Sequence, residues 1–438
     1  MQRSLGRYWT ALRERGVRRL VAERYKRYVK QRLLRKVVYP RLVEFELRGL
    51  ARANEARRKR LARSAVPPPA GTVYVVICVD AEGPHRHAPY RQWDDVAAEV
   101  GRVASPAFRR ELADRAGRPF AMNWFAMDWL GPGQNAGGHD LGFHRILDRY
   151  RTWIQEANAL GFGDELHWHH HHVPAGRVEG YNRNWLDAPR YEEILSRRLI
   201  ERGVWHVLYR AGNTWEDEAC SQWLERFIPF DLSSRGPYRN VHYDWARAPR
   251  EWVLYHPNPD DVQRPGSQQR FMARCLDIEK GGFRDDEIEQ SFLDAAEGRD
   301  SYLSFYMHDF RPMSEFVEDG ISRIRRVAAL YPTVLWQHAG GVELFQRMGR
   351  LSPPSTPLAL EAVQRGPDLV VETNLPTFGE PWVAVEDDAG FRRVDAVRIA
   401  ERTWRARVGT SLRRYGVAVS GIAGNAAWTV SSGVGDGK

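Results

Sequence analysis

The sequence predicts an α/β fold, preceded by a basic helical extension and followed by a small all-β domain. A continuous β-branched run at residues 73–79 is typical of a strand buried on both faces in a parallel sheet. Strand-like and helix-like stretches then alternate over about 270 residues, which is the pattern of an α/β sheet or barrel. After residues 352–354 short strand-like segments between Gly, Pro and Asp turns take over, and they indicate a β-sandwich.

The first domain, residues 1–65, is predicted to form basic amphipathic helices. Apolar residues recur there at roughly helical spacing, namely Leu5, Trp9, Leu12 and Leu20, then Tyr25, Val29 and Leu33, until Pro40 interrupts the pattern. The segment contains 21 Lys and Arg but only 5 Glu, a net charge of +16. Such helices bind anionic membranes or acidic partners. The alternatives are a solvated extension, of which the run 57–60 would be one face, or an arm that packs on the protein itself.

The rest of the chain has a different charge balance, with 44 basic and 51 acidic residues and a net charge of −7. A protein that binds nucleic acid through its fold would not be acidic there, so we expect no nucleic-acid partner. The sequence contains no transmembrane run and no secretory signal with an apolar middle. Three widely separated cysteines suit a reducing compartment, which favours a cytoplasmic location.

The central domain is predicted at residues 72–345 and the β domain at 355–432. Strands are expected in the central domain at residues 73–79, 120–125, 165–171, 205–210, 229–233, 302–307 and 333–337, with helices at 141–159, 191–202, 220–227, 285–296 and 322–330. Strands are expected in the β domain at 369–372, 382–386, 403–408 and 417–422.

The stretch from residue 165 to residue 172 contains five histidines within six residues. In a strand, His167, His169 and His171 would share one face, and His170 and His172 the other. Three imidazoles on one face make a metal half-site, because neutral imidazole is a preferred ligand of divalent first-row metals. A polyhistidine tract without a role is less consistent with the Trp-rich, apolar surroundings.

Further polar residues follow the ends of the predicted strands. Asp80 and Glu82 follow the first strand, Arg210 ends the fourth, and His308 and Asp309 follow a late one. Active sites of α/β folds lie at the carboxyl ends of the strands, so these side chains are candidates for a shared site. Asp128, after the second strand, either lines that site or caps a turn.

The order of these motifs resembles the polysaccharide deacetylase family, metal-dependent carbohydrate deacetylases that include enzymes acting on chitin oligosaccharides. The resemblance covers about residues 72–345 and implies an incomplete (β/α) barrel. It implies that Asp80 is the general base and that Glu82, where the family more often has Asp, is a metal ligand. It further implies that Arg210 orients Asp80 and that His308 is the general acid.

The resemblance leaves the histidine ligands open between two forms of the second motif. A His-x-x-x-His form gives His167 and His171, whereas a Glu-x-x-x-His-x-His form gives His169 and His171. We prefer His169 and His171, because Glu165 matches the leading Glu of the second form. The separate Asp that usually tunes the late histidine has no clear counterpart, and Asp309 is the available substitute.

The expected activity is the metal-dependent removal of acetyl groups from an N-acetylated glycan or glycan precursor, in polysaccharide biosynthesis or modification. The expected cofactor is one divalent ion, with zinc as the first choice for a His-rich site. Residues 1–63 would hold the enzyme at the cytoplasmic face of a membrane. The alternatives are a catalytically weak glycan-binding barrel and a hydrolase of another non-peptide amide.

Overall fold

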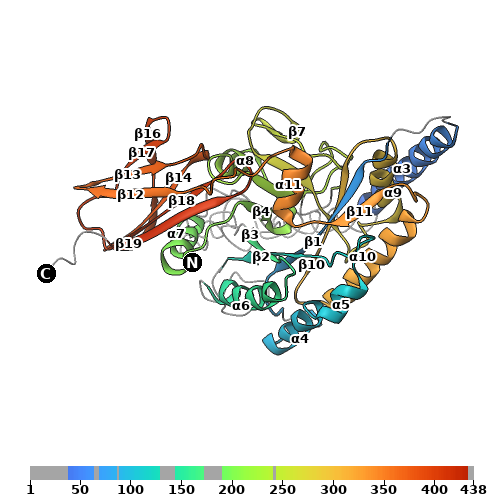
Figure 1. Ribbon diagram of the computed structural model, residues 1–438, viewed down its shortest axis with the longest axis horizontal. Coiled ribbons are helices and arrows are strands. Elements are labelled where there is room, and N and C mark those ends of the chain that lie inside the picture. Colours follow the sequence, from blue (N-terminus) through green and yellow to red (C-terminus); the bar gives the residue numbers. More distant parts are fainter. Residues whose placement is uncertain are drawn as a thin grey trace, which may run out of the picture.

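The centre of the molecule is a nearly closed barrel of parallel strands (Figure 1). We describe a computed structural model of the protein over residues 38–63, 69–85, 88–128, 144–171, 190–239 and 243–432. The barrel strands are β1 (Thr72–Ala81), β2 (Met122–Met127), β3 (Glu165–His170), β4 (Leu208–Ala211), β5 (Phe230–Ser234), β8 (Phe271–Arg274), β9 (Leu276–Asp277), β10 (Ser301–His308) and β11 (Leu335–His338). The fold class predicted from the sequence is thus confirmed.

Strand pairing shows how the barrel closes. One edge of β1 pairs with β10, while its other edge pairs with β11 along its first half and with β2 along its second half. At the far end of the sheet, β8 pairs with β5, and β9 pairs with β10. Only Cys275 separates β8 from β9, so one bent segment joins the two ends of the sheet. The barrel strands pair in parallel, which brings their carboxyl ends to one rim.

Helices follow most of these strands and cover the barrel. They are α4 (Trp93–Val103), α5 (Pro106–Glu111), α6 (Arg145–Ala159), α7 (Arg190–Arg202), α8 (Glu218–Leu224), α9 (Asp285–Ala296), α10 (Met313–Ala328) and α11 (Gly341–Gly349), with a 3₁₀ turn at Gly212–Thr214. The helix expected at residues 322–330 begins at Met313 instead. Gly320 lies inside it, and a Cβ there would come within 2.7 Å of the Phe305 ring. Close packing against Phe305 thus accounts for glycine at position 320, although glycine lowers the helix propensity of this segment.

The segment between β5 and α9 also contains the short antiparallel pair β6 (Pro257–Asn258) and β7 (Asp261–Pro265), which the sequence did not predict. The chain after the barrel forms two four-stranded antiparallel sheets (Figure 1). One contains β12 (Leu360–Arg365), β13 (Asp368–Thr373), β17 (Thr403–Arg407) and β16 (Ala396–Ala400), and the other β15 (Gly390–Val394), β14 (Phe378–Asp387), β18 (Arg414–Ser420) and β19 (Ala426–Ser432).

The central part of β14 in the second sheet is buried on both faces, and its side chains alternate between two different cores. Val383 and Val385 of β14 point into the sandwich core. Trp382, on the opposite face, packs against Trp223 and Phe227 of the barrel. A side chain of this size, fully buried between the two units, fixes the sandwich to the barrel.

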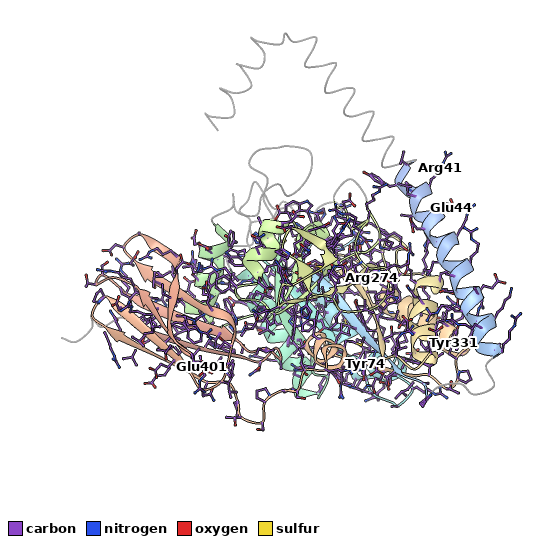
Figure 2. The ribbon with its side chains drawn as sticks, turned by 90° about the horizontal axis from the view of Figure 1, so that it is seen from above. Arg41, Glu44, Tyr74, Arg274, Tyr331 and Glu401 are labelled. Carbon is purple, nitrogen blue, oxygen red and sulfur yellow. The ribbon has the colours of Figure 1, made fainter. Side chains whose placement is uncertain are left out.

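Helix α3 (Tyr39–Ala62) runs along the edge of the barrel opposite the sandwich (Figures 1 and 2). Its first turn contains Pro40, a position where proline is compatible with a helix. Residues 1–37, which include the apolar repeats of the predicted tail, lie outside the described residues. None of the helices in the described part of the chain is long and apolar enough to cross a bilayer.

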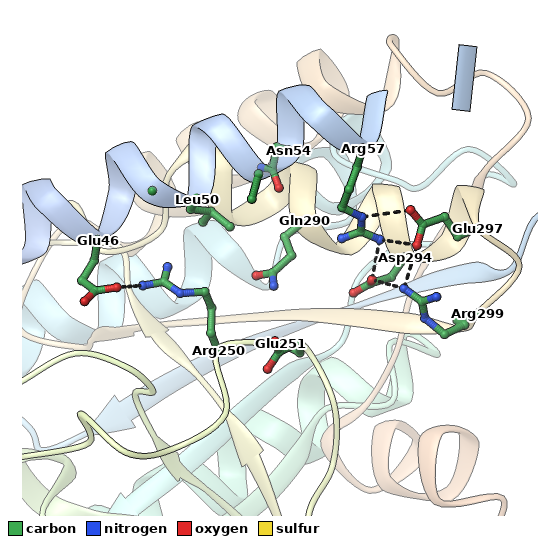
Figure 3. A pocket seen from close by; sticks show the side chains of 12 residues that line it. Glu46, Leu50, Asn54, Arg57, Arg250, Glu251, Gln290, Asp294, Glu297 and Arg299 are labelled. Carbon is green, nitrogen blue, oxygen red and sulfur yellow. Dashed lines mark hydrogen bonds and ion pairs between the residues drawn. The ribbon is translucent and has the colours of Figure 1, made fainter. Parts of the chain in front are cut away.

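The inner side of α3 is bound to α9 by ion pairs, with a cavity of about 500 Å³ between them (Figure 3). Arg57 pairs with both Asp294 and Glu297, at 2.8 Å each. At the other end of the cavity Glu46 pairs with Arg250. The basic run 57–60 is therefore not simply a solvated face: Arg57 is only 20% exposed, and it neutralises acidic groups of the barrel.

Candidate active site

Strand register explains why residues far apart in the sequence meet at the carboxyl rim. Asp80 at the end of β1 is the direct partner of His308 on β10. His169 on β3 is likewise the partner of Arg210 on β4. Asp80, His169 and Arg210 are almost completely buried, and His308 is partly exposed. The rim therefore carries a compact ionisable cluster in which the His308 imidazole is partly exposed.

Glu82 and two histidines form a group of donor atoms suited to a metal ion. Oε1 of Glu82 lies 2.9 Å from Nε2 of His171 and 3.5 Å from Nε2 of His169. The three donor atoms all lie within 4.8 Å of one another. Burial raises the pKa of Glu82, but the neighbouring imidazoles, His171 first, outweigh burial and hold that pKa well below its usual value. Glu82 is thus a carboxylate, the form that binds a cation.

The protonation of His169 also suits metal binding. Its Nδ1 lies 2.9 Å from the carbonyl oxygen of Arg210, which can only accept, so Nδ1 carries the proton. Nε2 then presents its lone pair, and within the described part of the chain it has no hydrogen-bond partner. Such a bond from the distal nitrogen is the usual support of a histidine ligand. The His171 ring packs on Gly212, where a Cβ would come within 2.6 Å of it.

The other two described histidines of the run belong to different environments. His167 contacts Glu165 at 3.0 Å and Asn123 at 3.4 Å, and it is not part of the cluster around Glu82. His170 points to the opposite face, where Nδ1 lies 2.6 Å from Asp128. Asp128 also pairs with Arg198, at 3.1 Å, so it is a buried structural partner. His172 lies outside the described residues.

Asp80 is held as a charged group by Arg210. Nε of Arg210 donates to Oδ1 of Asp80 at 2.6 Å, and the guanidinium lies 3.5 Å from the centre of the Tyr306 ring. Burial raises the pKa of Asp80, but the neighbouring cations, Arg210 first, outweigh burial and hold the pKa below its usual value. Oδ2 remains 4.0 Å from Nε2 of His308. Asp80 can therefore accept a proton at neutral pH.

Glu279 is the partner of His308, and the sequence did not indicate it. Its Oε1 lies 2.9 Å from Nδ1 of His308 and accepts from the backbone N–H of His308 at 2.6 Å. Burial lowers the pKa of His308, but the carboxylates of Glu279, Glu82 and Asp80, with Glu279 first, together more than offset burial, and the pKa rises to about 9. His308 therefore carries a proton at neutral pH. Glu279 follows β9, which is only two residues long and gives no strand pattern.

The expectation that Asp309 substitutes for this partner is wrong. The Asp309 carboxylate accepts hydrogen bonds from the backbone of Glu82 and Gly83 and from Tyr150. Successive residues of a strand point to opposite sides, so Asp309 cannot share the direction of His308. Glu279, two residues after the short strand β9, contacts Nδ1 of His308 instead.

The residues present fit a divalent cation at Glu82, His169 and His171. Donors on one ion at about 2.0–2.2 Å lie roughly 3–4 Å apart, and the two distances from Glu82 are close to that range. A second group, formed by Asp80, Glu82 and His308, also brings donors together. It fits less well, because Arg210 binds Asp80 and the proton on His308 blocks its lone pair.

Comparisons with known proteins give remote likenesses only. The sequence matches no protein-family model and no curated protein. A Parabacteroides distasonis protein, provisionally assigned as a glycoside hydrolase/deacetylase, is 11% identical over 72% of this chain and 81% of its own, with a TM-score of 0.37. A Cellulomonas fimi endo-β-1,4-mannanase double mutant is 10% identical over 77% of this chain and 69% of its own, with a TM-score of 0.22. At these values function must be argued from the site itself.

Proposed function

We propose that this protein is a metal-dependent hydrolase that removes acetyl groups from an N-acetylated glycan or glycan precursor, as the resemblance to polysaccharide deacetylases implies. The supporting observation is the meeting of three groups at one rim: the triad Glu82, His169 and His171, a carboxylate held by Arg210, and a protonated imidazole held by Glu279. A barrel that only bound glycans would need neither the carboxylate nor the imidazole.

Asp80 and His308 would divide the proton transfers between them. Asp80, charged and fixed through Oδ1, would take a proton from the attacking water with its second oxygen. His308, which carries a proton on Nε2 and is fixed through Nδ1, would protonate the leaving amine. Arg210 would keep Asp80 charged and oriented. These roles require Asp80 to be deprotonated and His308 to be protonated at the same pH. Their neighbours favour this, because Arg210 lowers the pKa of Asp80 and Glu279 raises the pKa of His308.

A divalent ion held by Glu82, His169 and His171 would supply Lewis-acid polarisation of the acetyl carbonyl and would favour ionisation of water. We propose zinc, because two imidazoles and one carboxylate form a ligand set common in catalytic zinc sites.

Release of acetate from N-acetylated glycans tests this function. Wild-type protein loaded with zinc should release acetate from at least one member of a panel of chitin oligosaccharides and other N-acetylated polysaccharides. Asp80→Asn should keep its zinc and lose about 10²–10⁴-fold in kcat, the usual contribution of general acid–base catalysis. Zinc-loaded wild-type protein that releases other acyl groups but no acetate would favour the hydrolase of another amide.

We propose in addition that the basic extension attaches the enzyme to an anionic membrane surface. The inner side of α3 is neutralised by the barrel, but Arg41 and Arg52 are exposed beside Phe45, which is 67% exposed. Arg48 on the same side pairs with Glu44 at 2.5 Å. Residues 1–37 add 13 Lys and Arg against 2 Glu. Attraction to an anionic surface is about 1 kcal/mol per basic residue and is screened by salt.

Vesicle sedimentation separates this proposal from a purely structural role. Full-length protein should pellet with anionic vesicles at low salt and be released at high salt. Deletion of residues 1–37 removes none of the described contacts of α3 and should weaken pelleting without loss of acetate release. Full-length protein that stays in the supernatant with anionic vesicles at low salt would contradict the membrane proposal.

A further inference from the structure

Asp309 follows His308 in the sequence, but its side chain binds the loop after β1. Oδ1 accepts from the backbone N–H of Glu82 at 3.0 Å, and Oδ2 accepts from that of Gly83 at 2.8 Å. Oδ2 also accepts from the hydroxyl of Tyr150 on α6, at 2.7 Å. The backbone N–H of Asp309 donates to the carbonyl of Asp80 at 3.3 Å. One fully buried residue thus ties the end of β10 to the segment 80–83.

The loop that Asp309 binds turns sharply at Gly83. Gly83 has a φ of +75°, a left-handed conformation that favours glycine. A Cβ at Gly83 would come within 3.0 Å of the Trp93 ring, so the turn is also closely packed. Glu82 and Gly83 are buried, and their N–H groups need an acceptor to adopt this turn. The Asp309 carboxylate supplies it to both groups with charge-assisted hydrogen bonds.

The direction of the Glu82 side chain depends on this turn. Glu82 is the only carboxylate of the triad with His169 and His171. The two histidines are fixed from other elements, His169 by the carbonyl of Arg210 and His171 by packing on Gly212. Without an acceptor for its N–H group, Glu82 would keep its charge but lose the backbone geometry that aims it at the two imidazoles.

We infer that Asp309 is a positioning residue for the metal ligand Glu82, and that it determines the affinity and geometry of the metal site rather than the proton transfer by His308. This inference rests on the proposed metal site. Replacing a residue that hydrogen-bonds to a metal ligand typically changes metal affinity by about 10–100-fold.

Tyr150 provides the matched control for a merely structural role. Tyr150 is fully buried, and its ring packs against Trp124, with centroids 5.1 Å apart. Tyr150→Phe removes one of the three hydrogen bonds to Asp309 and keeps the two that hold the loop. Asp309→Asn keeps the size of the side chain, but its single carbonyl oxygen cannot serve both backbone N–H groups in the same way.

The experiment measures the binding of Co²⁺ to protein stripped of metal, followed by its visible absorption. Asp309→Asn should raise the Co²⁺ dissociation constant by about 10–100-fold and alter the absorption bands that report coordination geometry. Tyr150→Phe should stay within about threefold of wild type, with an unchanged spectrum. Glu279→Gln changes the side chain that contacts Nδ1 of His308. It should shift the pH dependence of acetate release but not the Co²⁺ affinity. If Asp309→Asn does not fold, Asp309→Glu replaces it, since it keeps the charge and displaces the acceptors by one methylene.

Two contrary results have different meanings. If His169→Gln lowers Co²⁺ affinity and Asp309→Asn leaves both affinity and spectrum unchanged, the positioning role is wrong while the metal site stands. If wild type and His169→Gln bind Co²⁺ equally, the metal site itself is misplaced and the inference falls with it.

Discussion

Replacing Glu279 with glutamine should convert His308 from a protonated group into an ordinary histidine. Glu279 is 2% exposed, and one of its oxygens contacts both the backbone nitrogen and Nδ1 of His308. Glutamine keeps an oxygen that can accept from Nδ1. The substitution thus removes the charge and preserves the geometry, so any change in the titration of His308 reports the electrostatic role of Glu279.

The size of the effect follows from the pKa of His308. The difference between the usual value, 6.5, and a pKa of about 9 corresponds to roughly 3 kcal/mol in favour of the protonated imidazole. An opposite charge at this distance shifts a pKa by roughly 1–3. The pKa of His308 should therefore fall to about 6–8 in Glu279→Gln, and at least about half of the proposed acid would be deprotonated at pH 8.

Two assays test this reasoning. NMR titration of labelled histidine in metal-free protein should place the pKa of His308 near 9 in wild type and lower in Glu279→Gln. In zinc-loaded protein the alkaline limb of kcat for acetate release should move to lower pH in the variant, with little change at pH 6. Arg311→Gln is the control, because it removes the cation 3.1 Å from the other oxygen of Glu279 and leaves the charge of Glu279 in place. An unchanged titration of His308 in Glu279→Gln would show that Glu279 does not stabilise the protonated imidazole.

The remaining predictions concern metal, stability and pH. His169→Gln should reduce bound zinc to well below one equivalent by mass spectrometry, whereas His167→Gln, two residues away on the same face, should retain it. Trp382→Ala should lower the free energy of unfolding in urea by about 3–5 kcal/mol, whereas Trp428→Ala, 46% exposed, should change it by less than about 0.5 kcal/mol. Burial raises the pKa of Glu297, but its hydrogen bonds to arginines of α3 lower it to about 2 from 4.5. A lowered pKa gives a contribution that is complete above pH 4.5 and lost as pH falls toward 2. The protection of α3 against hydrogen exchange, taken relative to the intrinsic exchange rate at each pH, should therefore fall over this range, and Glu297→Gln should abolish that step.

The sequence predicted those parts of the fold in which one strong local pattern determines the structure. The β-branched run became β1, a strand that is paired at both edges and buried along nearly all its length. The predicted helix at 285–296 is α9 with the same bounds. Helices α4 and α11 were not predicted, although α11 contains an apolar stripe with Leu344 and Phe345. It is short and begins and ends with glycine, which weakens a helical pattern.

The candidate site shows the same division between local and tertiary determinants. Strand ends placed Asp80, His169 and His308 at one rim, since parallel strands end on the same side. Glu279 could not be found in this way. The strand before it, β9, forms through two paired residues on β10 and has no strand pattern of its own in the sequence. The true direction of Asp309 follows from tertiary hydrogen bonds to a loop 226 residues or more away in sequence. Such contacts leave no periodic signal in the chain.

The most direct test of the proposed activity is a titration of metal-free protein with zinc, with acetate release from an N-acetylated glycan as the readout. Acetate release should be absent without zinc, should rise to saturation at one equivalent, and should show no comparable rise in His169→Gln at the same zinc concentrations. Full acetate release by the metal-free protein, or none at saturating zinc across the glycan panel, would contradict the proposed activity.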